Sequence, residues 1–412
     1  MSSQITPRPV RRRRVFYIPG YDPFHPRRYR ELYRKESAAQ AAISGYEIAL
    51  RPRSEQGAYG WHVSVAMGET ECETEVEVLV WRDIVKDSMS TSITATYMQL
   101  VSTAWRYIAS GALARLMRLR KGPVIAALYP VVFLLGQLLI ALWAGWGLSE
   151  LAGAGLAVAG LSAITPFSLV LLPAVAYGIL RWFQAHDRRV FAYYLMHDYA
   201  HSAGFSGAYP PELETRLTEF KARIAAALRE DVDEVLVVGH SSGAYLGVTV
   251  LADLIRDGVP GGGPALSYLS LGQVVPMVSF LPCADRLRGD LQFLSESDDL
   301  TWVDVTAPGD GCAFALCDPV AVTGVAREGQ KWPIVISAAF TQTLSPERWQ
   351  ELRWRFFRLH FQYLCAFDRP RDYDYFQITG GPMTLADRFK GRAHSRSRKA
   401  EALSKYTSVT AK

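Results

Sequence analysis

One serine of this chain has the sequence context of an enzymatic nucleophile. Residues 239–243 read GHSSG, which matches the pattern G-x-S-x-G, and no other stretch of the chain matches it. The wholly apolar run Val235–Val238 precedes the motif and an apolar helical pattern follows it, so the sequence predicts a strand, a tight turn and a helix. Such a turn exposes the hydroxyl of Ser241 at the end of a sheet and directs the backbone N–H of Ser242 at a developing oxyanion. A turn that cradles a phosphate at the helix N-terminus is the alternative.

A second stretch near the N-terminus fits the same chemistry. Val15–Gly20 is a short apolar run that ends in Pro-Gly, which is a strand-then-turn signal. With this stretch and the GHSSG motif, the chain resembles the α/β-hydrolase superfamily, in particular its lipase- and esterase-like members. The resemblance implies hydrolysis of an ester, amide or thioester through an acyl-enzyme on Ser241. It also implies that the loop after the upstream strand supplies a second oxyanion donor, here the backbone N–H of Tyr21. Pro-Gly stands where many relatives have His-Gly, and an ordinary turn is the alternative.

The resemblance implies a chain order for the other catalytic residues, with an acid and then a histidine after the serine. His360 and His394 are the only histidines after Ser241. We expect His360 to be the base because it stands among residues that can pack it, whereas His394 stands in a tail rich in Arg, Lys and Ser. A packed histidine on a helix face is the alternative. Asp310, in a loop after a late strand, is the expected acid, Asp318 is the second choice, and a plain Pro-Gly-Asp-Gly turn is the alternative.

These residue types together support acyl transfer. Ser241 would attack the carbonyl carbon, and His360 would take its proton and return it to the leaving group. Asp310 would fix the imidazole tautomer and stabilise the imidazolium. We expect no cofactor and no metal ion, because the spacing of the other histidines near carboxylates matches no metal motif, and we interpret them as structural or interfacial. These are His186, His197 and His201, which stand near Asp187 and Asp198.

Strand and helix signals alternate along most of the chain, as in an α/β fold with a mostly parallel sheet. We expect the fold class to be an α/β-hydrolase fold that is interrupted by an inserted transmembrane helical hairpin. Strands are expected at residues 15–18, 46–51, 61–67, 75–81, 234–238, 266–271, 302–306 and 334–340, and helices at 27–43, 211–229, 244–255 and 348–364. A loop inside the last of these helices is the alternative.

A long apolar stretch interrupts this pattern. From residue 122 to residue 180 the only charged side chain is Glu150. Pro123–Trp146 is long enough to cross the hydrocarbon core of a bilayer as a helix. The rest of the stretch is too long for one crossing, so we expect a loop or shallow helix at 151–160 and a second span at 161–182. Two buried core helices are the alternative.

The charges around this stretch predict its orientation. Basic residues flank both ends of the hairpin, and positive residues stay on the cytoplasmic side. The loop at Tyr21 precedes the hairpin and Ser241 follows it, and both must meet at one carbonyl oxygen, which requires an even number of spans. We therefore expect a multi-pass protein of the inner (cell) membrane with two spans and a cytoplasmic catalytic domain. An amphipathic helix at 97–108 is expected to lie on the membrane or to cap the soluble core. The flanking basic residues are Arg115, Arg118, Arg120, Lys121, Arg181, Arg188 and Arg189.

The composition agrees with a folded protein in a reducing compartment. The chain has 412 residues, 45 Lys and Arg against 40 Asp and Glu, and 49% hydrophobic residues, which excludes a disordered, collagen-like or disulfide-rich chain. Its five cysteines contain no CxxC pair and are expected to be reduced. The basic run Arg11–Arg14 is expected to be a solvated arm or a contact to anionic lipid head groups. The expected units are two parts of one hydrolase domain at 1–121 and 184–389, the hairpin at 122–183 and a basic disordered tail at 390–412.

Three functions fit these features. The first is a membrane-anchored serine hydrolase that cleaves a lipid or another hydrophobic acyl ester. The second is an acyltransferase that passes the acyl group to an alcohol with the same triad, and the third is a non-catalytic membrane scaffold on a hydrolase fold. Membrane lipids are expected partners. Nucleic acid is not, because the basic residues cluster at the termini and the membrane flanks and imply no aromatic-lined groove.

Overall fold

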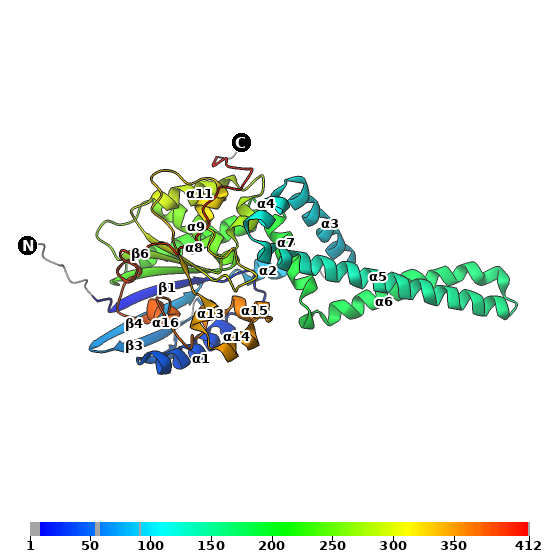
Figure 1. Ribbon diagram of the computed structural model, residues 1–412, viewed down its shortest axis with the longest axis horizontal. Coiled ribbons are helices and arrows are strands. Elements are labelled where there is room, and N and C mark those ends of the chain that lie inside the picture. The colour runs from blue at the N-terminus through cyan, green and yellow to red at the C-terminus, as the bar shows by residue number, and fades with distance from the viewer. Residues whose placement is uncertain (1–8, 54–57, 90–91, 411–412) are drawn as a thin grey trace, which may run out of the picture.

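The computed structural model describes residues 9–53, 58–89 and 92–410. Figure 1 shows a sheet between layers of helices and a long helical hairpin that projects from one end of this body. In the described residues eight strands form one sheet, in the order β2-β3-β4-β1-β5-β6-β7-β8. Along the sheet from β4 to β8 all neighbouring strands are parallel, and β3 is antiparallel to both of its neighbours. The expected α/β fold with a mostly parallel sheet is therefore confirmed. The strands are β1 (Arg12–Ile18), β2 (Glu47–Pro52), β3 (Gly60–Met67), β4 (Thr70–Val78), β5 (Glu234–His240), β6 (Ala265–Leu271), β7 (Thr301–Thr306) and β8 (Ile334–Ser337).

Helices cover both faces of the sheet. On one face α8 (Pro211–Ala227), α9 (Ser242–Arg256) and α11 (Asp285–Glu296) pack against side chains of β1, β5 and β6. On the other face α1 (Arg27–Ser44) and the helices after β8 pack on the alternate residues of the same strands. Every residue of β5 is buried, which explains why its sequence is apolar almost throughout and does not alternate. The other helices of the body are α2 (Arg82–Ser88), α3 (Ile93–Ala109), α4 (Ala112–Leu119), η2 (Asp187–Arg189), α7 (Ala192–Ala203), α10 (Val275–Ser279), α12 (Pro319–Thr323), α13 (Phe340–Thr343), α14 (Pro346–Leu352), α15 (Phe356–His360), η3 (Gln362–Leu364), α16 (Tyr375–Gly380) and α17 (Leu385–Arg388).

The carboxyl ends of the parallel strands lie at the end of the body that carries the hairpin. In Figure 1, β1 starts on the side remote from the hairpin and runs towards it. Because the strands from β4 to β8 are parallel, their carboxyl ends meet at this edge. Loops from distant parts of the chain therefore converge there, as they do at ligand sites of parallel sheets.

The helix expected at 348–364 is divided in the structure. Ser345 caps α14, since its Oγ accepts the N–H of Arg348 at 3.2 Å. The non-helical residue Arg355 then separates α14 from α15. The alternative of a loop inside this helical stretch is therefore confirmed, and His360 stands at the end of a short helix.

The hairpin consists of α5 (Lys121–Val158), the 3-10 helix η1 (Ser162–Val170) and α6 (Leu171–Ala185). The loop or shallow helix expected at 151–160 is wrong, because α5 continues to Val158 and the chain turns only after it. Glu150 therefore lies within α5 and not in a connecting loop.

Two glycines of α5 allow the returning chain to pack closely against this helix. A Cβ at Gly145 would lie 2.6 Å from the carbonyl oxygen of Leu172, and a Cβ at Gly153 would lie 3.1 Å from Oγ of Ser168. Gly145 and Gly153 thus serve close packing between α5 and the returning chain, as is common between membrane helices, and do not mark a loop.

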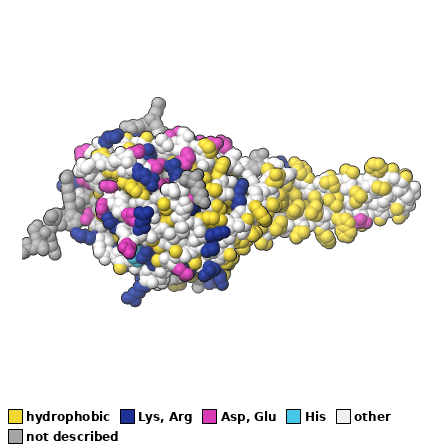
Figure 2. All heavy atoms as spheres, turned by 90° about the horizontal axis from the view of Figure 1, so that it is seen from above, with side chains coloured by type: hydrophobic (Ala, Val, Ile, Leu, Met, Phe, Trp, Pro, Cys, Tyr) yellow, Lys and Arg dark blue, Asp and Glu magenta, His cyan; other side chains and the backbone are white. Residues whose placement is uncertain are grey.

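Most side chains of the hairpin are exposed. Only 28% of the most apolar part of α5 and 17% of that of the η1–α6 segment is buried, so the alternative of two buried core helices is wrong. By length and composition, both segments could cross a membrane. Figure 2 shows many apolar side chains and a single acidic one over the hairpin, whereas charged side chains are spread over the body.

The amphipathic helix expected at 97–108 is part of α3, which packs one face and exposes the other. Leu100 is buried against the base of the hairpin and α7, and the hydroxyl of Tyr107 donates to the carbonyl oxygen of Met277 at 2.9 Å. Ile93 packs against Ala141 of α5. The opposite face exposes an apolar stripe of Met98, Val101, Trp105 and Ile108.

The C-terminal segment is ordered on the body as far as Thr410, and only its last two residues lie outside the described part. Arg398 forms an ion pair with the buried carboxylate of Asp318, and Nζ of Lys399 donates to the carbonyl oxygen of Leu119 at 2.7 Å. Leu403 is buried. The expectation of a disordered tail is therefore wrong, because acceptors on distant elements bind its basic side chains.

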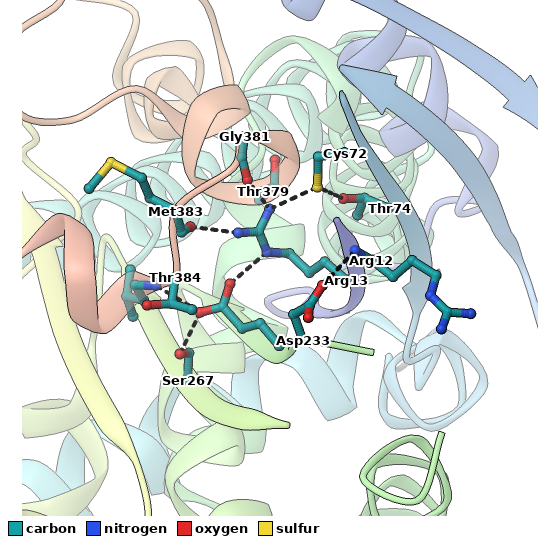
Figure 3. Close-up of polar contacts among 12 residues, drawn as sticks. Arg12, Arg13, Cys72, Thr74, Asp233, Ser267, Thr379, Gly381, Met383 and Thr384 are labelled. Atoms are coloured by element: carbon teal, nitrogen blue, oxygen red, sulfur yellow. Dashed lines mark hydrogen bonds and ion pairs between the residues drawn. The ribbon is translucent and has the colours of Figure 1, made fainter. Parts of the chain in front are cut away.

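Arg12–Arg14 of the basic run near the N-terminus begin strand β1, so the run is not a solvated arm, although Arg11 and Arg12 are exposed. Nε of Arg13 lies 2.6 Å from Oε2 of Glu234, and both side chains are fully buried. The Arg13 guanidinium also donates to the carbonyl oxygens of Gly381 and Met383 (Figure 3). Arg14 pairs with Glu75 at 2.6 Å. The partners come from other strands and from the C-terminal part, so the run itself gives no sign of them.

Candidate active site

Ser241 occupies a strained turn between β5 and α9. Its backbone has φ 57° and ψ −120°, a conformation that a non-glycine residue adopts only when the surrounding structure enforces it. The N–H of Ser241 donates to the carbonyl oxygen of Leu271, at the end of the neighbouring strand β6, at 2.9 Å. The strand–turn–helix arrangement predicted around the motif is therefore present, with the serine at the carboxyl edge of the sheet.

Both glycines of the motif are required by close backbone contacts. A Cβ at Gly239 would lie 2.5 Å from the carbonyl oxygen of Gly243. A Cβ at Gly243 would lie 2.0 Å from the carbonyl oxygen of Ile18, the last residue of β1. These distances are shorter than any side chain tolerates, so the two glycines allow α9 to approach β5 and β1 closely.

The loop after β1 lies directly against the serine. A Cβ at Gly20 would lie 2.9 Å from Cβ and 3.4 Å from Oγ of Ser241. Nε1 of Trp81 donates to the carbonyl oxygen of Pro19 at 3.0 Å, and the hydroxyl of Tyr194 donates to that of Tyr21. The structure thus brings the proposed donor segment at Tyr21 to the nucleophile and fixes its backbone from two sides.

His360 and Asp310 form a hydrogen-bonded pair at the same edge. Nδ1 of His360 lies 2.7 Å from Oδ2 of Asp310, and both side chains are buried. With Nδ1–H donating to the carboxylate, Nε2 is left as a proton acceptor. A Cβ at Gly272 would lie 3.1 Å from Cε1 of His360, so the imidazole sits over the end of β6, beside the residue whose carbonyl binds Ser241.

Asp310 is kept ionised by its partners. Burial alone would raise its pKa, but the interaction with His360 and hydrogen bonds from Cys312 and Tyr363 lower the pKa below the ordinary value. The N–H of Cys312 donates to Oδ1 at 2.9 Å and the hydroxyl of Tyr363 donates to Oδ2 at 3.0 Å. A carboxylate with several donors can stabilise a histidine that gains a proton.

His240, within the motif, positions the backbone of His360. Burial, together with the charge of His360, lowers the pKa of His240 to about 3, so the ring is neutral at pH 7. Its Nε2 lies 3.0 Å from the carbonyl oxygen of His360 and donates to it. Sequence reasoning missed His240 and also Tyr363 and Tyr194, because each acts through a contact to a residue far away in the chain.

His394 and Asp318, the other candidates for the base and the acid, lie away from Ser241. Nδ1 of His394 accepts the N–H of Val335 at 3.1 Å, at strand β8. Asp318 caps α12, where its Oδ1 accepts the N–H of Val320 at 2.9 Å, and it pairs with Arg398. Both residues have structural partners, and neither lines the cavity at Ser241.

Ser241 and His360 line one cavity of about 430 Å³. Gly20 and Tyr21 line it from the loop after β1, and Pro123 lines it from the first turn of α5. Most of the remaining wall is apolar and includes Phe24, Phe191, Val274, Met277, Phe357 and Phe361. The cavity therefore suits a hydrophobic ligand whose reacting group lies at the serine.

One cluster has residue types that bind zinc, but its geometry fits a hydrogen bond. The ligand atoms of Asp310, Cys312 and His360 lie within 4.8 Å of one another. However, the 2.7 Å contact between Asp310 and His360 leaves no room for an ion between them, and burial raises the pKa of the Cys312 thiol well above its ordinary value. The hydrogen bond between His360 and Asp310 therefore accounts for the cluster.

The three histidines that stand near carboxylates in the sequence have protein contacts. Nδ1 of His197 lies 2.8 Å from Oε1 of Gln99. His186 contacts the carbonyl oxygen of Trp182 at 2.8 Å. Burial lowers the pKa of His201 to about 4, and its ring packs against Tyr21. None of the three is part of the metal-type cluster found among the described residues.

Comparisons with protein-family models, with curated proteins and with solved structures found no match to this chain. The function is therefore inferred from geometry. A strained serine, an imidazole paired with an ionised carboxylate, and a backbone loop against the serine hydroxyl line one apolar cavity. These groups are the parts required for nucleophilic acyl transfer.

Proposed function

We propose that the protein is a membrane-anchored serine hydrolase with an α/β-hydrolase fold that cleaves a hydrophobic acyl ester through an acyl-enzyme. The observation that carries this proposal is the strained turn at Ser241, which places its hydroxyl against Gly20 in the cavity that His360 also lines. A turn that only binds phosphate would not need an imidazole–carboxylate pair at the same place.

In the proposed mechanism, Ser241 attacks the carbonyl carbon while Nε2 of His360 accepts its proton. Asp310 remains ionised and stabilises the imidazolium. The N–H groups of Tyr21 and Ser242 bind the oxyanion, which develops between the loop after β1 and the N-terminus of α9. His360 then returns the proton to the leaving alcohol. In the second half of the reaction, water attacks the acyl-enzyme while His360 accepts its proton, and His360 then returns that proton to Ser241 as the acid leaves.

The position of the hairpin supports a lipidic substrate. Pro123, in the first turn of α5, lines the catalytic cavity, so the cavity lies at the base of the hairpin. α5 has 38 residues and is about 57 Å long, so it can pack its first turns on the body and still cross a hydrocarbon core of about 30 Å. The exposed stripe of α3 would then lie at the membrane surface.

Purified protein in detergent should hydrolyse medium-chain esters such as octanoate esters, and Ser241→Ala should lower the rate by about a millionfold. Ser202→Ala is the matched control, because Ser202 lines the same cavity on α7 but stands outside the triad. An inactive wild-type protein, or an active Ser241→Ala variant, would overturn the proposal. Adding an alcohol and measuring ester formation distinguishes the acyltransferase alternative.

A further inference from the structure

A second carboxyl group lines the catalytic cavity, and the mechanism does not use it. Asp198 lies on α7, the helix that follows the hairpin, and lines the cavity together with Ser241 and His360. Among the described residues, no donor forms a hydrogen bond or ion pair with its carboxylate. Burial raises the pKa of Asp198 to about 7, although the charge of His360 lowers it in part.

Asp22, the other carboxylate that lines the cavity, has a full set of hydrogen-bond and ion-pair partners. Oδ1 of Asp22 accepts the N–H of Phe24 at 2.9 Å, and its Oδ2 accepts the hydroxyl of Tyr29. Asp22 also pairs with Arg28 at 3.3 Å. Asp198 has no such set of partners, and its half-buried side chain faces the cavity.

The two arginines that line the cavity, Arg28 and Arg358, pair with carboxylates other than Asp198. The guanidinium of Arg28 pairs with Asp22 and lies 4.9 Å from the ring centre of Phe361. Arg358 lies 3.8 Å from Glu351 and is largely exposed. The polar group that satisfies Asp198 is therefore expected to come from the ligand.

We propose that Asp198 binds a hydroxyl group in the alcohol part of the ester, so that the substrates are esters of a hydrophobic acid with a polyol such as glycerol. This inference rests on the proposed hydrolase function. The acyl chain is apolar and suits the aromatic wall, so the alcohol part is the one that brings a polar group into the cavity.

A hydroxyl fits this carboxyl better than a charged group does. A hydroxyl donates to a carboxylate and accepts from a carboxylic acid, so it binds Asp198 in either protonation state near neutrality. An ammonium group would bind only the ionised form, and a phosphate would be repelled by it. The alcohol part is therefore expected to be uncharged.

Two octanoate esters that differ by one hydroxyl test the proposal: the propyl ester and the 1,3-propanediol monoester. The wild-type protein should show kcat/KM about 10- to 100-fold higher for the monoester, the range expected for a hydrogen bond to a charged group in a cavity. Asp198→Leu should abolish this preference, and Asp198→Asn, which still donates and accepts, should keep most of it. Labelling of Ser241 by a fluorophosphonate reports that each variant is folded.

The outcomes distinguish a failure of the role of Asp198 from a failure of the hydrolase proposal. Equal turnover of both esters by the wild-type protein would overturn the role of Asp198 and leave the hydrolase proposal standing, and it requires no variant to fold. A preference that persists in Asp198→Leu would also overturn that role. A wild-type protein that hydrolyses neither ester and does not react with the fluorophosphonate would overturn the hydrolase proposal itself.

Discussion

Gly20 and Ser241 touch each other although the whole hairpin separates them in the chain. A Cβ on Gly20 would lie 2.9 Å from Cβ of Ser241, which is closer than two side chains can approach. If the hairpin crosses a membrane, both residues must therefore lie on the same side of it. The number of crossings between them is then even, and α5 with the η1–α6 segment supplies two.

This relationship predicts where the far end of the hairpin lies. The chain turns after Val158, so Gly160, and not Glu150, lies at the turn that connects the two arms of the hairpin. Gly160→Cys should react with a membrane-impermeant maleimide added to intact cells. The native Cys283, which is exposed on the body, is the internal control and should react only after permeabilisation. Protection of residue 160 in intact cells and labelling after permeabilisation would contradict a crossing hairpin.

The triad assignment predicts a graded loss of activity. His360→Ala should lower kcat about as much as Ser241→Ala, and Asp310→Asn should lower it about ten-thousandfold, because the asparagine no longer stabilises the imidazolium. His394→Ala should have wild-type activity, since His394 lies at β8. Full activity of His360→Ala in an ester hydrolysis assay would remove it from the mechanism.

The ionised state of Asp310 predicts a pH-dependent stability. Although burial opposes its charge, its pKa in the folded protein is below the ordinary value of about 4. The carboxylate therefore stabilises the fold above this value, and the contribution is lost as the pH falls towards the folded-state pKa. Between about pH 5 and pH 3 the free energy of unfolding in urea should fall more steeply for the wild-type protein than for Asp310→Asn. Parallel curves would show that Asp310 has no depressed pKa.

The buried pair of Arg13 and Glu234 lies at the amino ends of β1 and β5, remote from Ser241. Breaking it should have a large effect on stability and none on catalysis. Arg13→Met leaves Glu234 buried without its cation and should lower the free energy of unfolding by about 3–5 kcal/mol. Arg12→Met, on the exposed neighbour, should cost less than about 1 kcal/mol. Thermal unfolding of both variants in detergent measures the difference. Equal melting temperatures would mean that the Arg13–Glu234 pair contributes little.

The sequence allowed prediction of those features that depend on local patterns. The strand and helix around Ser241 and the apolar length of the hairpin can be read from neighbouring residues. The order of acid and histidine then pointed to Asp310 and His360, which the structure places 2.7 Å apart.

The missed features depend on contacts between distant segments. The partners of Arg13 come from residue 234 and from the backbone near residue 382, so the basic run resembled a solvated arm. Small residues after Glu150 resembled a loop, whereas they lie within α5, where Gly153 packs against the returning chain. Likewise, only the folded arrangement shows that Tyr194 binds the carbonyl of Tyr21 and that Asp198 lines the same cavity as Ser241.

The most direct test of the central claim is the site of covalent labelling by a fluorophosphonate, which reacts only with an activated serine. The protein should be labelled once, and mass spectrometry of its peptides should locate the phosphonate on Ser241. His360→Ala should label far more slowly, because the hydroxyl loses its base. Absence of labelling in folded protein, or a phosphonate on any other residue, would contradict the assignment of Ser241 as the nucleophile.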